Sequence, residues 1–138
     1  MRWADQLIKL TNFEVEVLQK RLAEITERRT LAELRMAVLV AEGEAEDLHA
    51  RQNAEAGWYM AGFKEALKRR KADVQGEIDR IATEEEGARD ALSEAFETLK
   101  KYENIAENAR LGEVRKEAQR ENAVLDEMGL RAASGRRW

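Results

Sequence analysis

The chain of 138 residues contains no proline and no cysteine. Proline removes a backbone donor and clashes with the preceding turn of a helix, so its absence permits long uninterrupted helices. The absence of cysteine excludes a disulfide framework and thiolate metal sites, and it fits a reducing, cytoplasmic location.

Aromatic residues are scarce, at 6% of the chain, whereas charged residues make up 38%. Alanine, glutamate, leucine, arginine and lysine dominate, and this composition is typical of long helices and coiled coils. The sequence contains no run of about 18 apolar residues, so no membrane-spanning helix is expected. The first ten residues lack the apolar core of a signal peptide. The formal net charge of −4 argues against a chain that mainly coats nucleic acid.

Apolar residues in the first third of the chain follow the alternating three- and four-residue spacing of a coiled-coil seam. We therefore expect a first helix from about residue 3 to about residue 49. Thr11 and Arg29 are the two polar members of this seam, whose residues are Ile8, Thr11, Val15, Leu18, Leu22, Ile25, Arg29, Ala32, Met36 and Leu39.

A polar stretch without seam residues follows and predicts a bend within about residues 51–57, where Asn53 and Gly57 are common turn residues. A second helix is expected over about 58–129, before a mobile tail over 130–138. Its spacing starts at Phe63, Leu67, Arg70 and Val74 and then slips to a run from Ile78 to Ala109, which predicts a stutter. The expected fold is all-α: an antiparallel two-helix coiled-coil hairpin with a longer second helix, in a single domain.

The unequal helix lengths predict that residues after about 106 have no partner in their own chain. This overhang nevertheless keeps an apolar stripe, which comprises Leu111, Val114, Ala118, Leu125 and Met128, interrupted by Glu121. A lone amphipathic helix is only marginally stable in water. The stripe therefore predicts a binding partner, and another copy of the chain is one candidate.

Catalysis is not expected, because a two-helix hairpin offers no dry pocket in which titratable groups acquire shifted pKa values. The single histidine, His49, is read as a surface residue rather than a metal ligand or base. No glycine-rich phosphate loop is present. We expect no cofactor and no metal.

Three further features leave alternatives open. Trp58, Tyr59 and Phe63 either cap the hairpin core or form a protein-binding hot spot. The charged seam residues Arg29 and Glu85 either fix the register of the helices or extend to solvent, and the second is the favoured interpretation. A basic cluster over residues 64–71 lacks interleaved aromatics for stacking on bases, so it is read as a solubilising or partner-steering patch.

The second helix resembles the flagellar export protein FliJ family, in the form found in short alphaproteobacterial members. The resemblance rests on the sequence FKEAL at residues 63–67 with Arg70 and Val74, and on LSEAFETLKKYE at residues 92–103. It continues through EVRKEAQRE at residues 113–121 and LDEM at residues 125–128. It covers most of the second helix and, loosely, the first.

The resemblance implies a soluble accessory component of the bacterial flagellar type III export apparatus, similar to the central stalk of rotary ATPases. Its implied partners are the export ATPase hexamer, the cytosolic domain of the export gate and substrate chaperones. Membrane contact would come only through the inner-membrane export apparatus. Carried over, the gate-binding stripe falls on Phe63, Leu67, Arg70 and Val74, with Arg70 standing where the family pattern has a small residue. The alternative function is a scaffolding coiled coil, for example in a non-flagellar type III secretion system.

Overall fold

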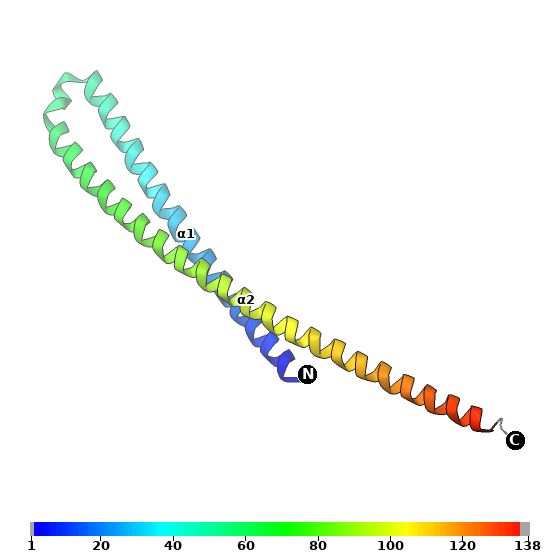
Figure 1. Ribbon diagram of the computed structural model, residues 1–138. Coiled ribbons are helices and arrows are strands. Elements are labelled where there is room, and N and C mark those ends of the chain that lie inside the picture. Colours follow the sequence, from blue (N-terminus) through cyan, green and yellow to red (C-terminus); the bar gives the residue numbers. More distant parts are fainter. Residues whose placement is uncertain (1, 136–138) are drawn as a thin grey trace. The chain divides into compact units, whose positions relative to one another are not determined.

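The computed structural model describes residues 2–135 and consists of two long helices joined by a short 3₁₀ segment (Figure 1). Helix α1 spans Arg2–Gln52, the 3₁₀ helix η1 spans Ala54–Tyr59, and α2 spans Met60–Gly135. The two α-helices contain 51 and 76 residues, so the predicted all-α hairpin with a longer second helix is confirmed. Among the described residues, none of the helices carries an apolar stretch that would cross a lipid bilayer.

The helix ends differ in part from the predicted ones. The second α-helix begins at Met60, because Trp58 and Tyr59 still belong to η1, and it continues to Gly135 rather than ending near residue 129. Residues 136–138, the last part of the predicted tail, lie outside the described residues. Gly129 does not stop the helix, because a single glycine lowers helix stability by only about 1 kcal/mol relative to alanine.

The chain forms two compact units, each containing parts of both helices. One unit is Val15–Glu94, which holds the bend; the other combines Met1–Glu14 with Ala95–Trp138.

In the unit Val15–Glu94, the predicted seam residues form the core. Ile25 and Ala32 of α1 pack with Ile81 and Ala88 of α2, and Leu22 and Ile78 cover this cluster. Fully burying a leucine- or isoleucine-sized side chain stabilises a fold by about 1.5–3 kcal/mol. The alternating three- and four-residue spacing therefore correctly predicted the core residues of this unit.

One seam position was predicted wrongly. Arg70 is exposed, whereas its neighbour Lys71 is half-buried. With Lys71 in place of Arg70, the three- and four-residue steps alternate without a break from Leu67 to Ala109, so no stutter follows Val74. The only pair of consecutive four-residue steps runs from Phe63 through Leu67 to Lys71, next to the bend.

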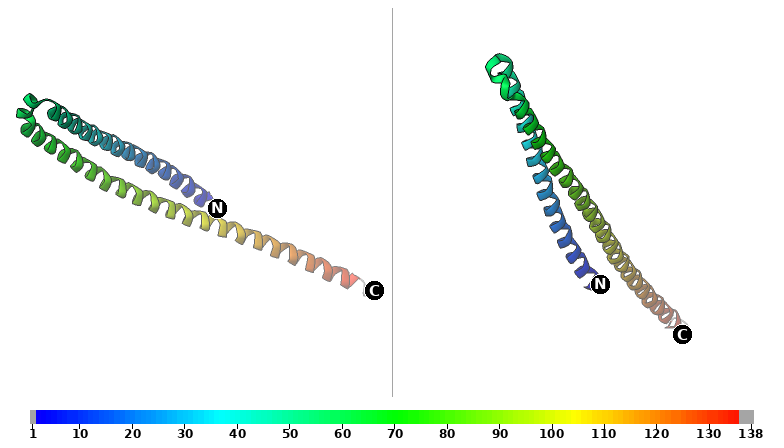
Figure 2. Two further views of the ribbon diagram at one scale, coloured as in Figure 1. Left: turned by 90° about the horizontal axis from the view of Figure 1, so that it is seen from above. Right: turned by 90° about the vertical axis from the view of Figure 1, so that its left-hand side faces the viewer.

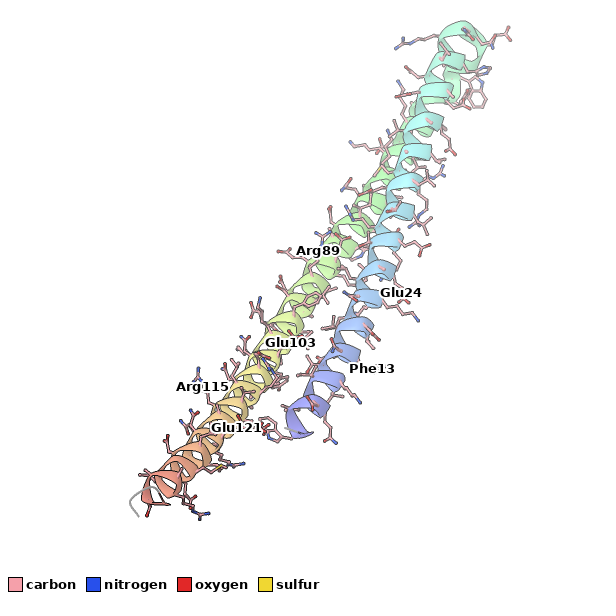
Figure 3. The ribbon with its side chains drawn as sticks, turned by 90° about the vertical axis from the view of Figure 1, so that its right-hand side faces the viewer. Phe13, Glu24, Arg89, Glu103, Arg115 and Glu121 are labelled. Atoms are coloured by element: carbon pink, nitrogen blue, oxygen red, sulfur yellow. The ribbon has the colours of Figure 1, made fainter. Side chains whose placement is uncertain are left out.

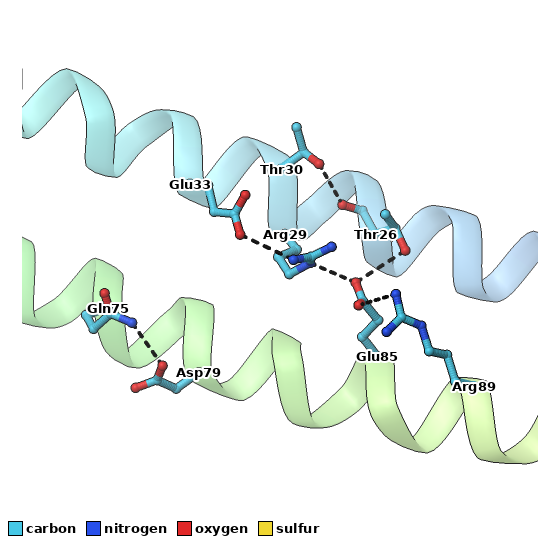
Figure 4. Close-up of polar contacts among 8 residues, drawn as sticks. All are labelled: Thr26, Arg29, Thr30, Glu33, Gln75, Asp79, Glu85 and Arg89. Atoms are coloured by element: carbon cyan, nitrogen blue, oxygen red, sulfur yellow. Dashed lines mark hydrogen bonds and ion pairs between the residues drawn. The ribbon is translucent and has the colours of Figure 1, made fainter.

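A polar layer interrupts the core at Glu85 (Figure 4). The Glu85 carboxylate is 5% exposed and accepts hydrogen bonds from Arg29 Nε at 2.8 Å and Thr26 Oγ1 at 3.3 Å, both across the helix pair. Arg89, one turn along α2, pairs with the other carboxylate oxygen at 2.9 Å. The favoured interpretation that Glu85 extends to solvent is therefore wrong, because its carboxylate is buried and paired across the helices.

Further ion pairs link the helices at the edges of this unit. Arg28 donates two hydrogen bonds of 3.1 Å to Glu84, and Arg35 donates one of 2.6 Å to Glu77. The hydrogen bond from Arg28 holds the pKa of the Glu84 carboxyl below its usual value. Exposed pairs of this kind contribute little to stability, because solvent screens them and two long side chains lose freedom when they pair.

In the unit of Met1–Glu14 and Ala95–Trp138, α1 buries Ala4 and Thr11, and α2 buries Ala95. The Thr11 hydroxyl donates to the Leu7 carbonyl at 2.8 Å, which satisfies this buried polar group. Gly112 is the last α2 residue that is not exposed, and every residue from 113 to 135 is exposed. The overhang, residues 113–135, thus begins later than the predicted position near 106, and it runs past the N-terminus of α1 without a neighbouring helix (Figure 2).

Candidate partner-binding surfaces

The bend is held by local hydrogen bonds and by one aromatic side chain. The Asn53 amide donates to the His49 carbonyl at 3.0 Å and closes the end of α1. The Tyr59 hydroxyl donates to Glu46 at 2.8 Å, and this bond raises the pKa of Tyr59 above its ordinary value. Trp58 meets Tyr59 edge to face, with ring centroids 5.9 Å apart, but is 87% exposed. Tyr59 therefore links the bend to α1 through Glu46, whereas Trp58 projects into solvent.

A close contact between the helices follows just below the bend, where Gly43 faces Leu67. A Cβ atom at position 43 would lie 2.6 Å from Leu67 Cδ2, which is well inside van der Waals contact. Leu67 is 7% exposed as a result. Because Gly43 has no side chain, Leu67 can pack directly against the α1 backbone at this position. Leu67 therefore belongs to the helix contact rather than to a free surface.

Phe63 lies in a groove along one edge of this contact. The groove, here called the Phe63 groove, has a volume of about 440 Å³. Lys64, Lys68 and Lys71 line it and give it a basic character, although Lys64 pairs with Asp47 at 3.5 Å. Its remaining lining residues are Val40, Gly43, Glu44, Asp47 and Leu67, so the groove carries three lysines and two carboxylates. Phe63 is half-buried in this groove, so it offers part of an aromatic ring beside positive charge.

The other two residues of the predicted gate-binding stripe lie elsewhere. Arg70 and Val74 line a separate groove of about 360 Å³ together with Val38, Leu39 and Glu42 among others. Arg70 is 3.8 Å from the Glu42 carboxylate. The two grooves share no lining residue, so the structure does not join the four predicted residues into one surface.

The overhang carries the second set of predicted residues. Leu111, just before it, is 39% exposed, and Val114, Leu125 and Met128 within it are 52%, 64% and 60% exposed. Successive spacings of 3, 11 and 3 residues, close to whole numbers of helical turns, place these side chains on one face of the helix. The structure therefore brings these four residues together in one unpartnered stripe.

Charged residues surround this stripe. Glu107 accepts two hydrogen bonds from Arg110, which holds the pKa of its carboxyl below the usual value. Arg131 pairs with Glu127 one turn away at 2.9 Å. Figure 3 shows Arg115 and Glu121 on the overhang, where side chains stand out from the helix into solvent. Local pairs of this kind add only weakly to the stability of a helix that lacks tertiary support.

Sequence reasoning missed a further apolar surface on α1. Leu31, Leu34, Val38 and Leu48 are 53%, 59%, 50% and 57% exposed, and Ala41 and Ala45 between them are also exposed. A repeat of seven residues, through 31, 38 and 45 and through 34, 41 and 48, is the signal that could have found it. The stronger seam repeat on the opposite face of the same helix masked this signal. Among the described residues, no group of three or more histidine, aspartate or glutamate side chains is placed to hold a metal ion.

Comparison with known proteins identifies the family. No protein-family model matches the chain, and no solved structure does so either. Two curated proteins, both named flagellar FliJ protein and from two strains of Caulobacter vibrioides, are 53% identical to it over 133 residues. Each alignment covers 96% of this chain and 96% of the relative. Identity at this level over nearly the full length of both proteins shows that the chain belongs to the FliJ family.

Proposed function

We propose that this chain serves the flagellar type III export apparatus by docking its overhang into the export ATPase hexamer and by binding the cytosolic domain of the export gate at the Phe63 groove. Membership of the FliJ family makes it a non-catalytic component of flagellar export. The alternative of a scaffolding coiled coil in a non-flagellar system is set aside, because both relatives are flagellar proteins.

The overhang is the single observation that carries the ATPase part of the proposal. Its 23 residues, about 35 Å of helix at the standard rise, keep an apolar stripe although no part of the described chain covers it. A helix of this length is marginal alone, so burial of the stripe in a partner would offset the cost of ordering it. The central opening of a hexameric ring would accommodate a single protruding helix.

The Phe63 groove supports the gate part of the proposal. It combines a half-buried aromatic ring with three lysines and two carboxylates. The remaining excess of positive charge beside the ring suits an acidic surface that carries an apolar side chain. Leu67 would act indirectly, by holding the groove in shape against Gly43. Arg70 and Val74 would contact the gate only if it also reaches the second groove.

Substrate chaperones complete the partners that the family implies, and no surface is assigned to them. Binding to the ATPase and to the gate would hold the chain in the cytoplasm at the periphery of the inner-membrane export apparatus.

Docking of the overhang is tested with the triple variant Val114→Gln, Leu125→Gln and Met128→Gln. All three side chains are at least half exposed, so the helix content and melting temperature should stay close to those of the unmodified protein. Affinity for the purified export ATPase, measured by calorimetry, should fall at least tenfold, and motility in soft agar should be lost. Leu130→Gln is the matched control, because Leu130 is 73% exposed and lies off the stripe. Unchanged affinity of the triple variant would refute docking through this face.

Gate binding is tested with Phe63→Ala against Phe96→Ala, which removes an aromatic ring from an exposed position on α2 outside the groove. Phe63→Ala should weaken binding to the purified cytosolic gate domain about tenfold or more, which is typical of a truncated aromatic anchor. Binding should also weaken as salt rises, because the lysines of the groove contribute through charge. Equal effects of the two substitutions would contradict the assignment of the groove.

A further inference from the structure

The outer face of α1 is apolar and has no partner among the described residues. Four large side chains on it are half or more exposed: Leu31, Leu34, Val38 and Leu48. By helical geometry Leu34 and Leu48 lie nearly half a turn around α1 from the buried seam residues Ala32 and Leu39. Leu31 and Val38 lie about 80–120° from them and form the edge of the face, where Val38 also borders the groove that contains Arg70 and Val74. Helix α1 is therefore apolar on two opposite faces, and α2 covers only one of them. We call the uncovered set, with Ala41 and Ala45, the outer stripe.

We propose that the outer stripe binds the outer stripe of a second copy of this chain, with the two α1 helices antiparallel. The residues on the stripe repeat every seven positions, which is the spacing of a two-stranded coiled coil. A symmetric pair uses the same surface on both subunits, so the stripe must complement itself.

The stripe complements itself in one antiparallel register. This register sets Leu31 level with Leu48, Leu34 with Ala45, and Val38 with Ala41 of the second copy. Leu34 and Val38 thereby oppose alanines, which allows close packing in these two layers, whereas Leu31 meets Leu48. A parallel pair would instead stack Ala41 and Ala45 each on itself between the Val38 and Leu48 layers and leave gaps.

Neighbouring registers are poorer because the stripe is bounded by polar residues. A slip of seven residues in one direction sets Leu48 level with Glu24. A slip in the other direction sets Leu31 level with Glu55, beyond the end of α1. Burying a carboxylate against leucine is costly unless the charge is paired.

Charge at the edge of the stripe favours the same register. In an antiparallel pair, Arg35 comes beside Glu42 of the second copy, and by symmetry this contact forms twice. Within one chain, these side chains contact Glu77 at 2.6 Å and Arg70 at 3.8 Å, in pairs that stay largely exposed. Such exposed pairs are weak, so each charge can also engage the second copy. Arg28 comes level with His49, and its charge is already matched by Glu84.

The size of the stripe predicts a weak dimer. It covers about five helical turns, less than the roughly 800 Å² per partner of a standard interface. We therefore expect a dissociation constant of about 1–100 µM.

Sedimentation equilibrium of the full chain at about 1–500 µM tests the proposal. The expected result is a reversible monomer–dimer transition that Leu34→Glu and, separately, Leu48→Glu weaken at least tenfold while helix content is unchanged. Leu10→Glu is the matched control, because Leu10 is 64% exposed on α1 outside the outer stripe. A monomer at every concentration would overturn the proposal, and so would equal effects of all three substitutions.

Cysteine cross-linking tests the register, and the native chain gives no background because it has no cysteine. The double variant Leu34→Cys/Ala45→Cys should form a disulfide-linked dimer under mild oxidation. Neither single variant should do so, because like positions lie about 16 Å apart along the axis in this register. Rapid cross-linking of Ala45→Cys to itself would instead show a parallel pair. A persistent monomer in which Leu34→Glu abolishes binding to another flagellar protein would show that the stripe takes a foreign helix. Either result would refute the antiparallel dimer.

Discussion

Replacement of Glu85 by glutamine tests whether the buried polar layer stabilises the hairpin. The Glu85 carboxylate is 5% exposed and accepts from Arg29 at 2.8 Å and Arg89 at 2.9 Å. Glutamine keeps the shape and one acceptor oxygen but loses the charge, and its amide group has only donors to offer to Arg89. Both guanidinium groups therefore lose a charged partner while little else changes.

The expected cost follows from the exposure of the partners. Removing one member of a fully buried ion pair costs about 3–5 kcal/mol. The Arg29 side chain is 33% exposed and the Arg89 side chain 60% exposed, and Arg29 has a second acceptor in Glu33 at 3.4 Å. Solvent and Glu33 should recover part of the loss, so we expect Glu85→Gln to lower the free energy of unfolding by about 1–2.5 kcal/mol.

Urea unfolding followed by circular dichroism at 222 nm measures this change, and the melting temperature should fall by about 3–10 °C. Glu33→Gln is the control, because Glu33 is exposed and should cost at most about 0.5 kcal/mol. A loss below about 0.5 kcal/mol for Glu85→Gln would refute the reasoning, since the buried charge would then contribute nothing.

The double variant Arg29→Met/Glu85→Leu separates stability from alignment. Replacing a buried pair by apolar residues of similar size is often neutral or stabilising. The melting temperature of the double variant should therefore lie above that of Glu85→Gln and close to that of the unmodified protein. If Glu85 also specifies alignment, spin labels placed across the helix pair should report a broader distance distribution. A distribution as narrow as that of the unmodified protein would show that the apolar seam alone sets the register.

Three further outcomes are expected. Leu67→Ala should lower the free energy of unfolding by about 2–4 kcal/mol. Adding Gly43→Ala should restore part of this loss, since the new methyl group occupies the space that Leu67 Cδ2 leaves. If the two substitutions instead lower the free energy of unfolding in urea by the sum of their separate effects, the contact is contradicted. The hydrogen bond to Glu46 raises the Tyr59 pKa, so its contribution is present below the unfolded pKa of about 10 and lost as pH rises through the folded pKa. The difference in urea midpoint between the unmodified protein and Tyr59→Phe should therefore vanish at high pH, and a constant difference would count against the bond. Amide hydrogen exchange should be fastest over residues 113–135, where no packing supports the helix, and uniform protection along α2 would contradict an unsupported overhang.

The sequence by itself predicted the fold class and most of the core, because helical periodicity depends only on which positions are apolar. Val15, Ile25, Leu39 and Ile81 were placed in the seam from spacing alone, and each is buried. The overhang was also predictable, since it follows from the unequal lengths of the two helices. Arg70 was misplaced because two neighbouring basic residues give the same signal, and only the contact with α1 distinguishes the half-buried Lys71.

The candidate surfaces depended more on tertiary structure. Spacing placed Phe63, Leu67 and Val74 on one helix face. It could not show that Gly43 leaves room for Leu67, or that Phe63 and Val74 line different grooves. Likewise, the sequence left Glu85 between solvent and core, and its burial was decided by Arg29 and Thr26 on the facing helix. The physical reason is the same in each case. Periodicity is a property of one helix, whereas burial, charge pairing and groove formation are set by the side chains that the second helix brings opposite.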